Sequence, residues 1–111
     1  MSSYSLSKLV NLQIQVFVAA EISNVTAVAI HPGIVMTDMA MDMFVPFAKD
    51  TPELIGGLGV WLATDQAAFL DGKYIGSNWS VEDLVARKDE ILSEGKLSIL
   101  LKGEFGKKQF E

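Results

Sequence analysis

Tyr4 and Lys8 are the two side chains in this sequence whose types and spacing most clearly suggest chemistry. They stand four residues apart in a segment that favours helix, so both project from one helical face. An ammonium group beside a phenol stabilises the phenolate, and this makes the tyrosine a usable proton donor or acceptor near neutral pH. The same spacing occurs in many helices without such a role, so the pair gains meaning only from the motifs around it.

His31 is the single histidine and follows a short apolar run. Its side chain type is the one that ordinarily titrates near neutral pH, so it is a candidate for acid–base catalysis, with a structural role at a strand end as the alternative. Asp38 and Asp42 form either a carboxylate pair or solvated groups that cap a loop. With one histidine and no cysteine, the sequence predicts no metal site.

A helix and a strand must position these residues. The segment Ser3–Ser23 holds no glycine or proline and predicts a helix. Its apolar residues form two faces that we expect to be buried, one with Leu9, Leu12, Val16 and Ala19 and the other with Leu6, Val10, Phe17 and Ala20. Val25–Ile30 is a nearly continuous, β-branched apolar run, which predicts a strand of a parallel sheet covered on both faces.

Pro32 and Gly33 end this strand, and residues 34–49 predict an irregular or partly helical loop. A helix follows that Asp50 or Thr51 caps, with Pro52 near its first position and its end near Ala68. We expect its glycines to permit close packing; they are Gly56, Gly57 and Gly59.

Beyond a turn at residues 69–72, the sequence predicts a short strand over Lys73–Ile75 and an amphipathic helix over Ser80–Leu92. Residues 1–102 are expected to form one domain and residues 103–111 a flexible tail.

Composition narrows the class of protein. The chain has 111 residues, 50% of them hydrophobic even without glycine, and this predicts an apolar surface that meets a partner. A net charge of −5 argues against binding to nucleic acid or anionic membranes. The sequence shows no secretory signal and no apolar run of ~18 residues, so we expect a soluble, cytoplasmic protein.

Three motifs together resemble a known family. The Tyr4/Lys8 pair followed by His31-Pro32-Gly33-Ile34-Val35-Met36-Thr37-Asp38 resembles the C-terminal half of a short-chain dehydrogenase/reductase. Asp71-Gly72-Lys73-Tyr74-Ile75, followed by residues 78–84, is similar to the ending of fungal members. The resemblance runs from Ser3 to about Leu101. It implies an α/β fold, namely a truncated Rossmann-like, doubly wound fold that retains the last two strands and their helices.

The resemblance also implies roles for individual residues. Tyr4 would be the general acid/base of hydride transfer, and Lys8 would hold the nicotinamide ribose. Pro32–Ile34 would line the nicotinamide, with the Ile34 backbone contacting the carboxamide, and Thr37 would reach the pyrophosphate. The 36–47 loop would be a substrate lid, and the residues expected to bind an apolar substrate are Met36, Met39, Met43, Phe44 and Trp79. Simple packing is the alternative for the methionines.

The family also needs a glycine-rich phosphate turn after its first strand, because only glycine lets the backbone approach a pyrophosphate. The sequence has no such turn: the 56–59 glycines follow no predicted strand and fail the G-x-G-x-x-G spacing. The family's catalytic serine and structural asparagine, which precede the tyrosine, are also missing. We therefore expect no cofactor for this chain by itself, and NAD(P) only if the missing half is supplied.

Three functions remain open at this point. The first is a cofactor-independent cyclase or isomerase acting on an apolar small molecule, with Tyr4 or His31 moving protons. The second is the catalytic C-terminal part of an NAD(P)-dependent oxidoreductase that needs its N-terminal half. The third is a non-catalytic partner or stabiliser of another enzyme. A homodimer through the Ser3–Ser23 helix and the bared edge of the Val25–Ile30 strand is expected, with completion of the fold by a missing chain or N-terminal region as the alternative.

Overall fold

The computed structural model describes residues 1–39, 42–103 and 106, so the predicted tail lies mostly outside the described residues. In the described part, the α-helices are α1 (Ser2–Glu21), α2 (Pro52–Leu62), α3 (Val81–Ala86) and α4 (Lys88–Ser93). The strands are β1 (Ala29–His31) and β2 (Tyr74–Gly76), and two 3-10 helices are η1 (Asp42–Phe47) and η2 (Asp65–Leu70).

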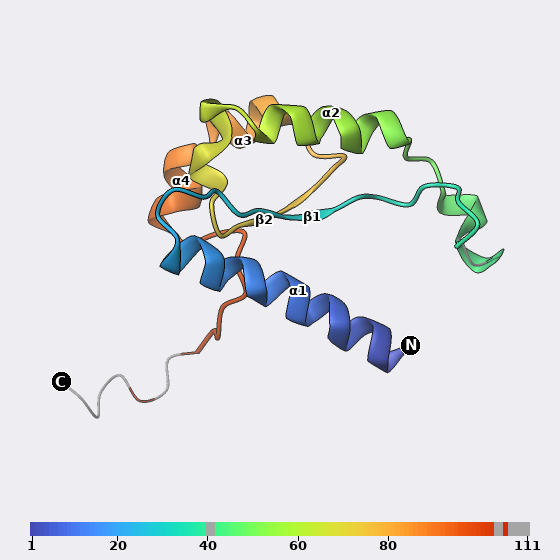
Figure 1. Ribbon diagram of the computed structural model, residues 1–111, viewed down its shortest axis with the longest axis horizontal. Coiled ribbons are helices and arrows are strands. Elements are labelled where there is room, and N and C mark those ends of the chain that lie inside the picture. Colours follow the sequence, from blue (N-terminus) through green and yellow to red (C-terminus); the bar gives the residue numbers. More distant parts are fainter. Residues whose placement is uncertain (40–41, 104–105, 107–111) are drawn as a thin grey trace.

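The sheet of the described residues consists of β1 and β2, which pair in parallel with Ile30 opposite Ile75. Parallel neighbours need a long crossover, and α2 provides it. Figure 1 shows α1 on one side of the strands and α2 and α3 on the other, so the sheet lies between helical layers. The predicted α/β class with a small parallel sheet is confirmed.

The hydrophobic core lies on the α2 side of the sheet. Leu58, Leu84 and Ile91, from three different helices, pack together with Leu70 and Ile75. Leu70 and Ile75 are fully buried. Because burying one such side chain stabilises a fold by about 1.5–3 kcal/mol, this cluster fixes α2, α3 and α4 against the sheet.

Helix α1 forms as predicted, but the expectation that both of its faces are buried is wrong, since no residue of α1 is buried. Leu12, Val16 and Ala19 on the first face are half-buried. Leu6, Val10 and Phe17 on the second face are 62%, 56% and 58% exposed. The sheet covers only one side of this helix, and no described element covers the other.

The first strand is shorter than predicted and begins at Ala29 rather than Val25. The Ala27 N–H donates to Asp71 Oδ1 at 2.7 Å, and the Ala27 C=O accepts from the Gly72 N–H at 2.8 Å. A turn rather than a neighbouring strand therefore holds residue 27. The strand is also covered less than expected, because Ile30 is only half-buried and His31 is exposed.

Helix α2 begins as predicted, with Pro52 first and the Thr51 hydroxyl accepting from the Leu54 N–H. It ends at Leu62 rather than near Ala68, because the chain tightens into η2. The expected packing role of its glycines is wrong: no side chain or neighbouring backbone lies within 4 Å of where a Cβ would stand at Gly56, Gly57 or Gly59. This face of α2 is open.

The predicted 80–92 helix is two short helices, α3 and α4, separated at Arg87. Ser80 caps α3 by accepting from the Asp83 N–H at 3.2 Å. The Arg87 side chain turns onto Glu90, one turn further on, with Nε and Nη2 each donating to the carboxylate at 2.8 Å. Leu84 of α3 and Ile91 of α4 both belong to the core.

Candidate functional site

A groove of about 820 Å³ lies between α1 and β1, and it gathers most of the residues that the sequence singled out. The first two turns of α1 contribute Tyr4, Ser5 and Lys8. The end of β1 and the turn after it contribute His31, Pro32 and Gly33. Residues far apart in the sequence thus line one surface, on the side of the sheet opposite the core.

The predicted pairing of Tyr4 with Lys8 on one face is confirmed. Lys8 Nζ lies 5.3 Å from the centroid of the Tyr4 ring. This distance is within the range of an attractive cation–π contact, which stabilises such pairs by about 0.5–1 kcal/mol at exposed sites. Tyr4 is 57% exposed, so its hydroxyl is accessible to a molecule in the groove.

His31 is positioned by the turn that ends β1. Gly33 has a φ of +83°, a conformation that glycine adopts readily, and its N–H donates to His31 Nδ1 at 3.1 Å. Because Nδ1 accepts this hydrogen bond, the neutral ring carries its proton on Nε2. The hydrogen bond from Gly33 thus holds the ring at Nδ1, and the Nε2–H is left as a donor.

Sequence reasoning missed two groove residues on α1, Asn11 and Gln15. The Gln15 Nε2 donates to the Gly72 C=O at 3.3 Å, and its Oε1 is buried without a hydrogen-bond partner among the described residues. An available signal was the spacing of residues 4, 8, 11 and 15, which places four polar or phenolic side chains on one helical face. Gln15 therefore offers an acceptor at the inner end of the groove.

Ile34 and Thr37, expected to contact a cofactor, do not line the groove. The Ile34 N–H donates to Asp50 Oδ2 at 2.8 Å, and its C=O accepts from the Asp50 N–H at 3.2 Å. Asp50 therefore engages both backbone polar groups of Ile34. Thr37 is exposed on the segment that follows.

The predicted substrate-binding residues separate into two places. Met36, Met39, Met43 and Phe44 are exposed on the segment before and within η1, and Figure 1 shows this segment extending away from the helical layers. Residues 40 and 41 of the predicted lid lie outside the described residues. Trp79 lines a second pocket, which shares no lining residue with the groove.

The residues present do not fit NAD(P) in this chain alone. The backbone of Ile34 is occupied by Asp50, and a Cβ at Gly33 would overlap the same carboxylate. The 56–59 glycines lie inside α2, where they form no phosphate turn. In the described residues no three His, Asp or Glu side chains gather as metal ligands. The chemistry that the groove can support is proton transfer at Tyr4 and His31.

The chain thus combines a small parallel α/β arrangement with a tyrosine–lysine pair near the end of β1. Proteins with similar sequences identify the class to which this combination belongs. The chain is 40% identical to the "Short chain dehydrogenase mpl6" of Monascus purpureus and to the "Short chain dehydrogenase citE" of Monascus ruber, in each case over 105 residues. It is 33% identical over 107 residues to the "Short chain dehydrogenase andI" of Emericella variicolor. These alignments cover 90–92% of the chain.

The chain is therefore homologous to the C-terminal part of fungal short-chain dehydrogenases, as its motifs indicated. It spans only about 36–37% of the length of these three relatives. No family model and no solved structure matches the chain. Among the described residues, no helix combines the length and apolar character needed to cross a bilayer.

Proposed function

We propose that this chain is the proton-transferring C-terminal part of an NAD(P)-dependent oxidoreductase and acts when combined with the part that its relatives carry in addition. One observation carries the proposal. Tyr4, Lys8 and His31 line a single groove, in a chain that matches 36–37% of the length of three fungal short-chain dehydrogenases. The groove supplies proton chemistry, whereas the described residues supply no dinucleotide site.

In this proposal the Tyr4 hydroxyl exchanges a proton with the oxygen of a bound alcohol or carbonyl compound. The Lys8 ammonium lies over the Tyr4 ring, 5.3 Å from its centroid, and lines the same groove. His31 lines the same groove, and its Nε2–H would be a second donor for that oxygen. Binding the nicotinamide cofactor falls to the complementary part.

The edge of β1 supports a complementary part. Ala29 and His31 direct their backbone bonds to β2, through the Lys73 C=O and the Ser77 N–H. Since successive residues of a strand face opposite edges, the backbone of Ile30 faces the other edge, where no described strand pairs with it.

The decisive experiment restores a complementary part. The region of the Monascus purpureus relative that precedes its match to this chain is fused ahead of Ser2, and NADH and NADPH are titrated into the fusion and into the chain alone. We expect binding and alcohol or ketone turnover by the fusion only. Turnover by the chain alone would contradict the proposal, as would a folded fusion that binds the cofactor but has no activity on any of a broad panel of alcohols and ketones.

Within that fusion, Tyr4→Phe is expected to lower kcat by roughly 10² to 10⁴-fold, because it removes the proton donor and keeps the ring. Cofactor affinity should be unchanged. Tyr74→Phe is the matched control, since Tyr74 also lines the groove but lies on β2, away from the Lys8 pair. Equal losses in the two variants would argue against a specific role for Tyr4.

A cofactor-independent cyclase or isomerase, the first possibility raised by the sequence, gains no support from this geometry. Such chemistry benefits from a site that excludes water, whereas Tyr4 and His31 are both exposed. The fusion experiment also separates the third possibility, because a non-catalytic partner would tolerate Tyr4→Phe without loss of effect.

Self-association is a second proposal and rests on α1. Its outward stripe, defined as Leu6, Val10, Ile14 and Phe17, is more than half exposed at every position. A contiguous apolar stripe on a 20-residue helix is typical of a surface that meets another helix. We propose that two copies of the chain pair through this outward stripe, leaving the Tyr4 face of α1 toward the groove.

A further inference from the structure

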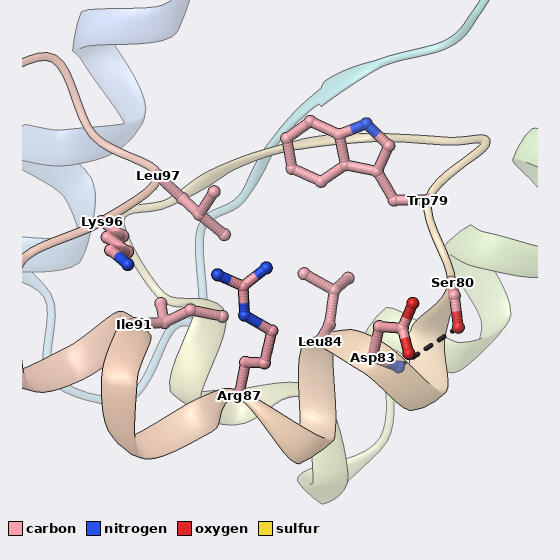
Figure 2. Close-up of a pocket in the computed structure, with 8 residues that line it drawn as sticks. All are labelled: Trp79, Ser80, Asp83, Leu84, Arg87, Ile91, Lys96 and Leu97. Carbon is pink, nitrogen blue, oxygen red and sulfur yellow. Dashed lines mark hydrogen bonds between the residues drawn. The ribbon is translucent and has the colours of Figure 1, made fainter.

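A second pocket, of about 370 Å³, lies on the core side of the molecule and takes no part in the function proposed above. Figure 2 shows its lining: Trp79 faces Leu84 across the cavity, Leu97 closes one end, and the Arg87 guanidinium extends into the space between them. The volume is at the small end of the range of about 300–1,000 Å³ typical of ligand pockets, so it suits a small molecule rather than a dinucleotide or a peptide.

The walls of this pocket are apolar and held in place. Leu84 and Ile91 belong to the buried core, so their positions are fixed by packing. Trp79 is 42% exposed, and its indole lies against Gly76, where a Cβ would come within 2.8 Å of Nε1. The Trp79 indole is therefore held against the Gly76 backbone and remains partly exposed, and such an aromatic surface favours stacking of a planar ring.

Leu97 reaches the pocket from a backbone conformation that is unfavourable for leucine. Its φ is 61°, and no other non-glycine residue in the described part of the chain has a positive φ. Its C=O accepts from the Tyr74 N–H at 2.8 Å, so the strand β2 helps to hold the conformation. A residue kept in a left-handed conformation costs about 1 kcal/mol or more, and such outliers concentrate at ligand sites.

The cationic and anionic side chains of the pocket lie in different parts of its lining. Arg87 uses Nε and Nη2 to bind Glu90, and no hydrogen bond in the described structure engages Nη1. The guanidinium is therefore already oriented and keeps N–H donors toward the pocket. Lys96 lies at the same end and pairs with Glu90 and Glu94, whereas the Asp83 carboxylate lies by Ser80, on the other side of Leu84.

We propose that this pocket binds a small planar aromatic molecule that carries one carboxylate, with the ring stacked on Trp79 and the carboxylate oxygen accepting from Arg87 Nη1. Asp83 repels an anion in the reverse orientation, so the charge distribution selects one direction of binding. Leu84, Ile91 and Leu97 exclude water from the remaining ring surface. The site shares no residue with the groove between α1 and β1 and is thus independent of proton transfer at Tyr4.

The test uses 2-naphthoate as the probe and the full 111-residue chain, labelled with ¹⁵N. Only Trp61 and Trp79 give indole signals, and Trp61→Phe assigns them. We expect the Trp79 signal to shift and saturate as naphthoate is added, while the Trp61 signal stays in place. The neutral 2-naphthamide should bind at least about tenfold more weakly, because a hydrogen bond to a charged acceptor is lost.

Two variants distinguish this site from general apolar binding. Arg87→Gln should weaken naphthoate binding about tenfold or more, whereas Lys88→Gln, which removes a neighbouring cation that lies over the Phe69 ring, should leave it unchanged. Leu97→Asn tests the wall without disturbing Arg87, because asparagine tolerates a φ of 61°, and it should also weaken binding. Backbone amide spectra establish that each variant is folded.

Three results would overturn the proposal. One is the absence of a saturable Trp79 shift up to millimolar naphthoate. Another is equal binding of naphthoate and naphthamide. The third is an affinity that neither Arg87→Gln nor Leu97→Asn changes in folded protein.

Discussion

The two sides of the sheet differ in how well each is completed. On the α2 side, three helices bury Leu58, Leu84 and Ile91, and Thr51 and Ser80 cap helix N-termini with their hydroxyls. On the other side lies α1, which at 20 residues is the longest helix described, and yet it buries no residue and has no side-chain cap. The residues with proton chemistry lie on this second, incomplete side.

The packed core on the α2 side and the groove on the α1 side therefore depend on different contacts. A helix in a protein gains most of its stability from the packing of its apolar face. Helix α1 is held by the half-buried Leu12 and Val16 and by the Gln15 hydrogen bond to Gly72. The α2 side is held together by its core, whereas the Tyr4 groove lies next to α1, whose outward stripe is exposed, and next to a β1 edge that no further described strand pairs with.

The largest expected effect contrasts the two sides directly. Leu70→Ala should lower the free energy of unfolding by about 2–5 kcal/mol, because it opens a cavity at a fully buried position. In the monomer, Leu6→Ala on α1 should change it by less than about 0.5 kcal/mol, since the residue is exposed in a single copy of the chain. Urea titration followed by circular dichroism measures both. A cost at Leu6 close to that at Leu70 would mean that α1 is covered in solution.

The second prediction concerns the outward stripe. If two copies pair through α1, Leu6→Lys combined with Phe17→Lys should convert a dimer into a monomer, because the charges cannot be buried in that interface. Sedimentation equilibrium gives the mass. Val60→Lys is the control, as Val60 is equally apolar and 75% exposed but lies on α2. A wild-type chain that is monomeric at all concentrations would contradict self-association.

The third prediction uses the open glycine face of α2. Gly56→Ala should raise the free energy of unfolding by about 0.5–1 kcal/mol, because alanine favours the helix and nothing lies near the added Cβ. Gly33→Ala is the contrasting variant and should be destabilising, since Gly33 has a positive φ and faces the Asp50 carboxylate. A loss of stability for Gly56→Ala would show that this face packs against something in solution.

The smallest effect is expected at the exposed ion network of α4. Hydrogen bonds from Arg87 and then Lys96 lower the pKa of the Glu90 carboxyl from 4.5 to about 2. Because the folded state favours the charged form, this contribution is fully present above pH 4.5 and is lost as the pH falls toward 2.

Glu90→Gln should therefore lower the urea midpoint at pH 6 and converge with the wild type near pH 2. Glu53→Gln, in the first turn of α2, serves as the control, since no described ion pair involves Glu53. A constant difference between Glu90→Gln and the wild type across this pH range would argue against the network.

Local patterns were sufficient for much of the fold. The first helix, predicted over Ser3–Ser23 and found over Ser2–Glu21, the cap predicted at Asp50 or Thr51, and the end of the strand at Pro32 and Gly33 follow from side-chain types that act within a few residues. The same holds for the Tyr4/Lys8 contact, which depends only on the helical repeat. Longer-range features were predicted less well. The start of β1 depends on Asp71, 44 residues from Ala27, and the burial of α1 depends on which distant segments pack against it.

Helix periodicity, turn chemistry and side-chain type are local properties, so the amino-acid sequence was enough to predict the α/β class, the family resemblance and the chemical character of the groove residues. Which of those residues meet depends on the packing of the folded chain. It joined His31 to the Tyr4 face, gave the Ile34 backbone to Asp50 and put Trp79 in a separate pocket beside Arg87. Such contacts arise when distant segments pack together, and no spacing along the chain encodes them directly.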